Sequence, residues 1–254
     1  MDVVIAILVK DKEATLPTFI TCLLNQTFPK ERSHLYIRTN DNTDKSEEIL
    51  SNFIKEHGTK YKSVLYDNTS ISDNLKKYKA HEWNIERFKI LGKIRNDSVK
   101  YALGNNSHYF VIDVDNFIVP STLNDMITIS SLGVIAPMLI TKTAYSNYHS
   151  SIDNNGYYTK DDTYLKILNK KIKGCIEVPV VHCTYFIANH LLNKISYDDN
   201  SYRYEYVIFS DVLRKQNIPQ YIDNRIEYGC ISFATTKEEF EEDWTIYKKV
   251  FKLK

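Results

Sequence analysis

Glycine and proline are scarce in this chain of 254 residues, which contains seven glycines and six prolines. None of the glycines is spaced as GxG, and the chain contains no Gly-Lys-Ser or Gly-Lys-Thr sequence. The glycine loops that hold phosphates at the start of a helix in many nucleotide-binding proteins are therefore missing. A diphosphate bound by this chain would need other groups to neutralise its charge.

Further absences narrow the class of protein. The four cysteines lie far apart without a CxxC pair, which favours free buried thiols over disulfides. The apolar run at residues 3–9 is too short to span a membrane and no cleavage site follows it, so we expect a soluble chain without a secretory signal, in a compartment left open. The formal charge of +1 provides no field that would attract nucleic acid.

Apolar runs alternate with amphipathic segments along most of the chain. Strands are predicted over residues 3–9, 35–41, 62–67, 108–113, 134–140 and 220–224. Helices are predicted over residues 15–26, 44–58, 85–103, 121–129, 202–216 and 235–252. This alternation predicts an α/β fold with a Rossmann-like, mostly parallel sheet flanked by helices. Residues 68–83 read as a polar loop, and the turn signals in residues 141–185 indicate a small antiparallel insert.

Polar side chains follow three of the predicted strands, at residues 10–11, 40–44 and 113–116. An open parallel sheet binds its ligands at the carboxyl ends of its strands, near the point where the strand order reverses. The pattern therefore predicts a ligand site at this edge of the sheet, and a nucleotide is the ligand that such sheets commonly take.

Two acids, Asp113 and Asp115, stand at the end of the buried stretch YFVIDVDNFI. The period of an extended chain puts both carboxylates on one side and turns Val114 back into the core. Two carboxylates on one face repel each other unless a cation lies between them, and Mg²⁺ or Mn²⁺ suits such ligands while leaving positions for phosphate oxygens. Acids also end strands as turn residues or caps. The apolar strand before the pair and the predicted sheet favour the metal site.

A family resemblance runs through almost the whole chain in one order. The residues that carry it are VIAILVKDKEATLP, TNDNTDKS, KIRNDSVKYA, YFVIDVDNFIVPSTL, VIAPMLITKTAYSNY, GYY, KGCIEVPVVHCTYFI and YIDNRIEYG. The chain resembles the N-terminal glycosyltransferase domain of the procollagen galactosyltransferases, which is itself similar to the glycosyltransferase part of the lysyl hydroxylases.

The resemblance implies a GT-A glycosyltransferase fold over residues 1–254 as a single domain, with a nucleotide-binding half at 1–118 and an acceptor-side half at 119–254. It also implies a metal-dependent transfer of a hexose, galactose or glucose, from a UDP-sugar to a hydroxyl acceptor. The cation would be Mn²⁺ or Mg²⁺. The acceptor would be a glycan or the hydroxylysine of a collagen-like peptide.

The resemblance also implies roles for single residues on the donor side. Val9 and Lys10 match the end of the first strand, which lies along the uracil in GT-A folds. Asn42 and Asp44 match a polar loop that contacts the base or the ribose. Arg95 matches an arginine that could reach the diphosphate from its helix, although a helix-surface charge is an equal alternative.

The remaining positions surround the expected metal. Asp115 would ligate the cation, and Asp113 would hold the ribose or bind the metal through water. His182 matches a family histidine that could complete the metal shell or hydrogen-bond the sugar, although a core histidine with internal partners explains it as well. The segment 141–165, with tyrosines that could stack on sugars or cover the sheet, would shape the acceptor groove.

One departure from the family bears on catalysis. The late helix reads YEYVIFS where the family has FDDIIVF, so Glu205 and Tyr206 replace the paired acids. Glu205 keeps a carboxylate and is the candidate general base that deprotonates the acceptor hydroxyl in an inverting reaction. A helix-surface acid is the alternative, and the stereochemical outcome stays open.

Two other classes of function stay in view. A nucleotidyltransferase or phosphohydrolase also uses paired acids on an α/β sheet, but usually adds the phosphate loop that this sequence lacks. A catalytically weak or inactive domain that only binds a nucleotide sugar or glycan is supported by the altered acids of the late helix. The sequence leaves a homo-oligomer open.

Overall fold

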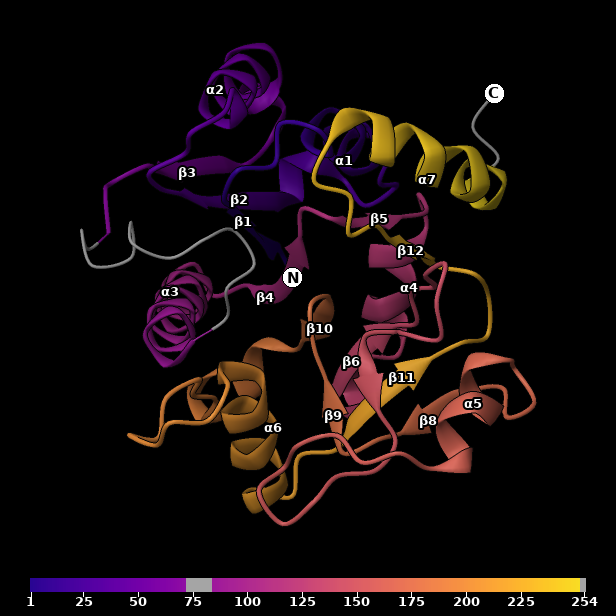
Figure 1. Ribbon diagram of the computed structural model, residues 1–254. Helices are drawn as coiled ribbons and strands as arrows, with labels where there is room; N and C mark the ends of the chain where they lie inside the picture. Colours follow the sequence, from indigo (N-terminus) through magenta and orange to yellow (C-terminus); the bar gives the residue numbers. More distant parts are fainter. Residues whose placement is uncertain (72–83, 252–254) are drawn as a thin grey trace.

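An eight-stranded sheet forms the centre of the computed structural model, which describes residues 1–71 and 84–251 (Figure 1). The strands lie in the spatial order β3 (Ser63–Asp67), β2 (Ser33–Thr39), β1 (Val3–Val9), β4 (His108–Asp113), β10 (Tyr185–Ile187), β6 (Val134–Pro137), β11 (Gln220–Asp223) and β8 (Cys175–Glu177). Strands β3, β2, β1 and β4 are mutually parallel, as are β6 and β11. Strand β10 runs antiparallel to both β4 and β6, and β8 runs antiparallel to β11.

Four shorter strands form two antiparallel pairs beside this sheet. The pairs are β5 (Asn116–Ile118) with β12 (Gly229–Ile231), and β7 (Tyr148–His149) with β9 (Val180–Val181). Both pairs join segments that are far apart in the sequence. The mostly parallel sheet with small antiparallel additions agrees with the architecture predicted from the sequence.

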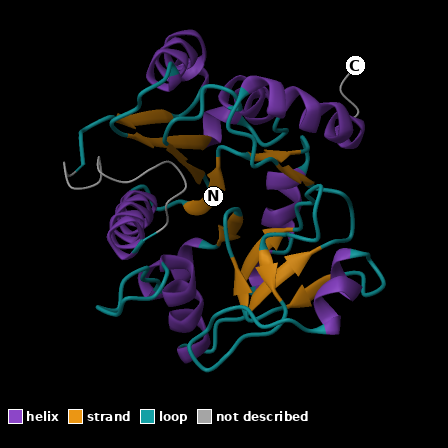
Figure 2. Ribbon diagram, viewed as in Figure 1, coloured by secondary structure: helices purple, strands orange, loops and turns teal. Residues whose placement is uncertain are grey.

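Helices flank the sheet on both sides (Figure 2). They are α1 (Leu16–Leu24), α2 (Ser46–His57), α3 (Ile85–Gly104), α4 (Thr122–Thr128), α5 (Asp162–Leu168), α6 (Glu205–Lys215) and α7 (Lys237–Phe251). Short 3-10 turns are η1 (Lys30–Arg32), η2 (Gly58–Lys60), η4 (Ser130–Leu132) and η5 (Asn189–Lys194). Within the two described ranges, none of the helices is both long enough and apolar enough to cross a bilayer.

The alternation of side chains along β1 explains why the fold has two hydrophobic cores. Val3, Ile5 and Ile7 point to one face, in the core that also contains buried residues of α1, α2, α4 and α7. Val4 and Ala6 point to the other face, in the core shared with α3, α5 and α6. A strand that is apolar at every position is therefore buried on both sides, as a parallel sheet requires.

The segment 141–185 differs in part from its predicted antiparallel insert. It does contain the pair β7 and β9, but it also contains helix α5, and β8 joins the main sheet. Asp161 caps α5 by accepting a hydrogen bond from the Tyr164 backbone N–H at 3.1 Å. The turn signals on both sides of it, DNNG before and KGC after, favoured short strands over this helix in the sequence pattern. Most of the predicted polar loop at 68–83 lies outside the described residues.

Gly229 provides a test of the junction between β5 and β12. Its φ is +149°, and a Cβ atom there would lie 1.9 Å from the carbonyl oxygen of Phe117. We expect Gly229→Ala to lower the free energy of unfolding by at least about 2 kcal/mol through strain and overpacking, measured by urea denaturation.

Gly104→Ala is the matched control, because a Cβ atom at Gly104 meets no neighbour within 4 Å. Gly104 ends α3, where alanine is the better helix former. Equal stability of the two variants would contradict the close approach at Gly229.

Candidate active site

The carboxyl ends of β1, β2 and β4 lie beside one another at one edge of the sheet. In the strand register Val9 pairs with Thr39, and Leu8 pairs with Asp113. The polar segments that follow these strands are therefore neighbours in space, as the sequence predicted. Val9 itself is buried in the core, and its carbonyl accepts a hydrogen bond from the Thr39 hydroxyl at 3.0 Å.

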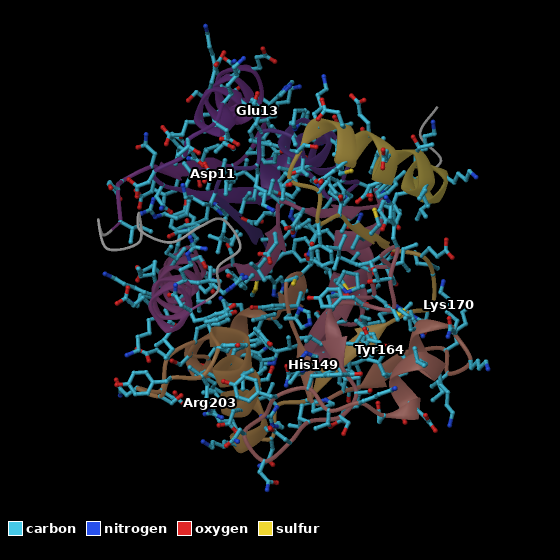
Figure 3. The ribbon with its side chains drawn as sticks, in the orientation of Figure 1. Asp11, Glu13, His149, Tyr164, Lys170 and Arg203 are labelled. Atoms are coloured by element: carbon cyan, nitrogen blue, oxygen red, sulfur yellow. The ribbon has the colours of Figure 1, made fainter. Side chains whose placement is uncertain are left out.

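Asn42 and Asp44 fasten the segment after β2 to the turn after β1. The Asn42 Oδ1 atom accepts from the backbone N–H of Asp11 at 2.9 Å, and Asp44 Oδ2 accepts from that of Glu13 at 2.8 Å. Asp11 Oδ1 accepts in return from the Thr43 N–H at 2.6 Å. Figure 3 labels Asp11 and Glu13 at this edge. Asn42 and Asp44 thus stabilise the two segments that follow β1 and β2. Their contact with a nucleotide-sugar donor stays a prediction.

Two lysines follow β1, and they point to different partners. The Lys10 Nζ atom pairs with Asp11 Oδ2 at 2.8 Å and also donates to the carbonyl of Asp41. The Lys12 Nζ atom reaches Asp115 Oδ2 at 2.9 Å. Lys12, which the sequence reasoning did not single out, is therefore the lysine at the acid pair. Its position two residues after Lys10 was the only signal available.

Asp113 and Asp115 project into one corner, and Val114 between them is buried in the core as predicted. Strand β4 ends at Asp113, however, so residues 114–115 form a turn and not the extended chain that was expected. The two side chains are partly buried, with 27% and 22% of their surface exposed. Burial raises the pKa of Asp113, and the negative charge of Asp115 raises that pKa further, against the opposing effect of Arg95. The carboxylates are close enough to repel each other, which is the condition that favours a bound cation.

Arg95 lies in the interior of the protein, between the acid pair and α6. Its Nη2 atom contacts Asp113 Oδ1 at 3.1 Å, and its Nε atom is 3.7 Å from Glu205 Oε1. The buried Nη1 atom has no hydrogen-bond partner in the described structure. Arg95 is therefore buried, and the alternative of a helix-surface charge is wrong. The structure places it where it pairs two carboxylates of different elements.

Gly92 lets α3 approach closely to the segment that leads into α6, beside this pairing. A Cβ atom at Gly92 would lie 2.7 Å from the carbonyl oxygen of Tyr197 and 3.5 Å from the Cβ of Glu205. Gly92 stands almost one helical turn before Arg95 on α3, and Glu205 is the first residue of α6. A larger residue at position 92 would clash with the Tyr197 carbonyl and displace the segment that leads into α6.

Glu205 is buried, and its Oε2 atom has no hydrogen-bond partner among the described residues. Burial raises the pKa of Glu205 to about 7, because desolvation of the charged form outweighs the attraction of Arg95. A carboxyl group with a pKa near neutrality can accept or release a proton at physiological pH, which suits a general base or acid. The alternative of a helix-surface acid does not describe this side chain.

His182 and Cys183 form a strained turn beside this corner. The Thr184 N–H donates to the His182 carbonyl at 2.7 Å, and Cys183 adopts φ of +64°, which is rare for a residue with a side chain. His182 Nδ1 lies 3.0 Å from the Cys183 thiol. Burial lowers the pKa of His182 well below its ordinary value. Backbone strain of this kind gathers at functional sites, but no sequence pattern pointed to Cys183.

The acid pair fits a hard divalent cation. Asp113 and Asp115 each keep one carboxylate oxygen without a hydrogen bond to a described residue. In the described part of the chain, no group of three or more His, Cys, Asp or Glu side chains is arranged to hold a metal, so His182 does not join the two acids in a three-ligand site. Mn²⁺ and Mg²⁺ accept one or two carboxylates and take their other ligands from phosphates and water.

The architecture is shared with solved glycosyltransferase structures. S. aureus TarS 1-349 in complex with UDP-GlcNAc superposes with a TM-score of 0.57 at 14% identity, over 90% of this chain and 57% of that one. The mannosyltransferase PcManGT from Pyrobaculum calidifontis, in complex with GDP-Man and Mn²⁺, gives 0.51 at 11% identity, over 87% and 56%. The chain therefore has the GT-A glycosyltransferase fold.

Sequence comparison defines the family. Residues 1–247 match the glycosyltransferase family 25 N-terminal domain, and the chain belongs to that family. It is 30% identical over 241 residues to a glycosyltransferase 25 family member of Anopheles gambiae, and 30% identical over 242 residues to procollagen galactosyltransferase 2 of Mus musculus. Each match covers 90% of this chain but only 41% and 38% of the relative, so the chain spans about two-fifths of the relatives' length.

The raised pKa of Glu205 predicts a pH dependence of stability. In the unfolded chain this carboxyl group ionises near pH 4.5, whereas in the folded protein it stays protonated up to about pH 7. The unfolded state therefore releases its proton first, and the free energy of unfolding falls as the pH rises between these values. We expect wild type to lose about 3 kcal/mol relative to Glu205→Gln across this range, measured by urea denaturation at several pH values. Parallel profiles for the two proteins would exclude the shift.

Proposed function

We propose that this chain is a metal-dependent glycosyltransferase domain that transfers a hexose, galactose or glucose, from a UDP-sugar to a hydroxyl acceptor. The observation that carries the proposal is the corner beside the buried Glu205, in which Asp113 and Asp115 each keep an oxygen that has no partner among the described residues. Family membership supports the reaction class. The nucleotide sugars named with TarS and PcManGT, and the Mn²⁺ named with PcManGT, support the donor class and the cation.

The half at 1–118 would bind the donor in this proposal. Asp113 and Asp115 would hold Mn²⁺ or Mg²⁺ with their free oxygens. Bound there, the cation would offset the charge that develops on the leaving diphosphate, a Lewis-acid contribution worth several kcal/mol. Lys12 adds a positive charge at the same corner. Val9 and Lys10 would lie along the uracil, and Asn42 and Asp44 would keep the loop beside it in shape.

The half at 119–254 would bind and activate the acceptor. Glu205 would take the proton of the acceptor hydroxyl on its unpartnered Oε2 atom while the hydroxyl oxygen attacks the anomeric carbon and UDP departs. Arg95 would keep Glu205 oriented and its pKa from rising further. His182 would line the sugar side of the corner as a neutral imidazole. The name of the Mus musculus relative suggests hydroxylysine of a collagen-like protein as one acceptor.

A binding domain without turnover is the second candidate. Each acid of the pair already has a cationic partner, Arg95 for Asp113 and Lys12 for Asp115. Tyr206 also stands where the family's second acid would be, directly after Glu205. Tight UDP binding without transfer or hydrolysis for any acceptor would favour this second function.

Asp115→Ala tests the metal site. We expect Mn²⁺-dependent hydrolysis or transfer of UDP-galactose or UDP-glucose to fall at least about 100-fold, because a ligand of the cation is lost. Circular dichroism and the melting temperature would show that the fold is kept. Glu242→Ala, an exposed acid of α7, is the control and should leave turnover unchanged. Near wild-type turnover of Asp115→Ala would refute the assignment.

Glu205→Gln tests the proposed base separately from donor binding. We expect kcat to fall by about 100-fold or more, because the proton acceptor is removed. The rise in melting temperature caused by UDP and Mn²⁺ should remain, since that rise depends on binding alone. Glu241→Gln on the exposed face of α7 is the control. A Glu205→Gln enzyme with unchanged kcat would rule out the base.

A further inference from the structure

A cavity that is partly open to solvent lies next to the candidate active site, between the segment that leads into β7 and the segment that leads into α5. Its volume is about 420 Å³, within the range of about 300–1,000 Å³ typical of small-molecule sites. We name it the tyrosine-histidine pocket. Its principal lining residues are Tyr145, Ser146, Tyr148, His149, Tyr158 and Tyr164. Figure 3 labels His149 and Tyr164 in this part of the molecule.

The wall of the pocket is rigid and aromatic. Tyr148 and Tyr164 stack with ring centroids 4.7 Å apart, and the Tyr148 hydroxyl donates to the Tyr164 carbonyl at 2.8 Å. Tyr158 meets Tyr164 edge-on at 5.8 Å. A β-bridge joins Tyr158 to Ile152, and the Thr159 N–H donates to the Ser151 carbonyl at 3.1 Å, so the backbone holds this ring in place.

Two tyrosines at the pocket are exposed although their neighbours are buried. Tyr158 is 45% exposed and Tyr145 is 37% exposed. Tyr148 and Tyr164, by contrast, are buried. Aromatic faces that are fixed in place and open to solvent can stack on the apolar C–H face of a ring-shaped ligand.

His149 contributes an unsatisfied polar atom to the same wall. His149 is only 9% exposed, and its buried Nδ1 atom has no hydrogen-bond partner among the described residues. The ring packs against Tyr158, His182 and Tyr206 at centroid distances of 5.3–5.8 Å. A buried nitrogen without a partner is costly, and a ligand hydroxyl would satisfy it once the ring turns to bring this atom to the surface of the pocket.

The pocket has no charged side chain among its described lining residues. A phosphate or carboxylate would therefore find no cation there, and the ammonium group of a lysine-type acceptor would find no carboxylate. An uncharged ring with an apolar face and several hydroxyl groups matches both the tyrosines and His149. A pyranose has this chemistry.

The pocket lies beside the candidate active site. The His149 ring is 5.4 Å from that of His182, and the Tyr145 ring is 5.8 Å from it. Cys183, the next residue, has a pKa that is raised by burial and by the charges of Asp113 and Asp115. The wall of the pocket thus borders His182, one of the residues expected at the active site.

We propose that the tyrosine-histidine pocket binds a pyranose ring of the acceptor, so that the acceptor is itself a glycoside. This inference rests on the proposed function, because it names the acceptor class for that reaction. Tyr158 stacks on the ring, and His149 hydrogen-bonds a hydroxyl. The reacting hydroxyl then lies toward Glu205 and the acid pair.

Saturation-transfer NMR with the whole chain tests the pocket directly. The probes are methyl β-D-galactopyranoside, methyl β-D-glucopyranoside and free 5-hydroxylysine. We expect at least one glycoside to bind wild type and hydroxylysine not to bind in the pocket. Tyr158→Ala and His149→Phe should each raise the Kd of that glycoside by about fivefold or more. Tyr202→Ala removes a tyrosine that is 69% exposed elsewhere and should leave the Kd unchanged.

Three results would overturn the inference: no glycoside binding, hydroxylysine binding that is lost in Tyr158→Ala, or equal glycoside Kd values in wild type and both pocket variants. Melting temperatures of the variants show whether each one is folded. UDP with Mn²⁺ is titrated on the same samples, together with Asp115→Ala. Glycoside binding that persists in Asp115→Ala supports the pocket. Wild type that binds the glycoside but not UDP would refute the proposed donor reaction while retaining the pocket.

Discussion

The burial of one guanidinium group constrains the whole site. Arg95 lies inside the protein, where an unpaired charge would be costly, so its guanidinium group requires carboxylate partners. Asp113 from β4 and Glu205 from α6 provide these partners. The three groups tie helix α3 to the central sheet and to the late helix. Two acids around one cation leave a surplus negative charge, and burial then pushes the pKa of Glu205 toward neutrality.

This arrangement joins the two halves of the proposed reaction. Asp113 belongs to the acid pair on the donor side, whereas Glu205 begins the helix on the acceptor side. Arg95 touches both, so the position of the base depends on the same side chain that orients one of the acids. The tyrosine-histidine pocket extends the acceptor side away from this centre. Its uncharged wall suits the proposed sugar ring, whereas the charged corner suits the proposed cation and diphosphate.

Some of the site was predictable from residue spacing and some was not. Asp113 and Asp115 were placed on one face by the period of an extended strand, and Val114 was correctly turned into the core. Helix α5 was missed because turn signals surround it, and β5 and β12 were missed because strands of three residues display no clear alternation. The partner of Asp115, Lys12, came from a turn more than 100 positions away in the sequence.

The sequence by itself determined most of the alternation of strands and helices along the chain, the two-sided burial of β1 and the acid pair at the end of β4. These features depend on local periodicity, which neighbouring residues along the chain establish. Only the tertiary structure decided which groups face each other: Arg95 with Glu205, Lys12 with Asp115, and His149 with Tyr158. Such contacts depend on how helices and loops pack across the sheet. Burial and pKa follow from that packing, because desolvation depends on every element around a charge.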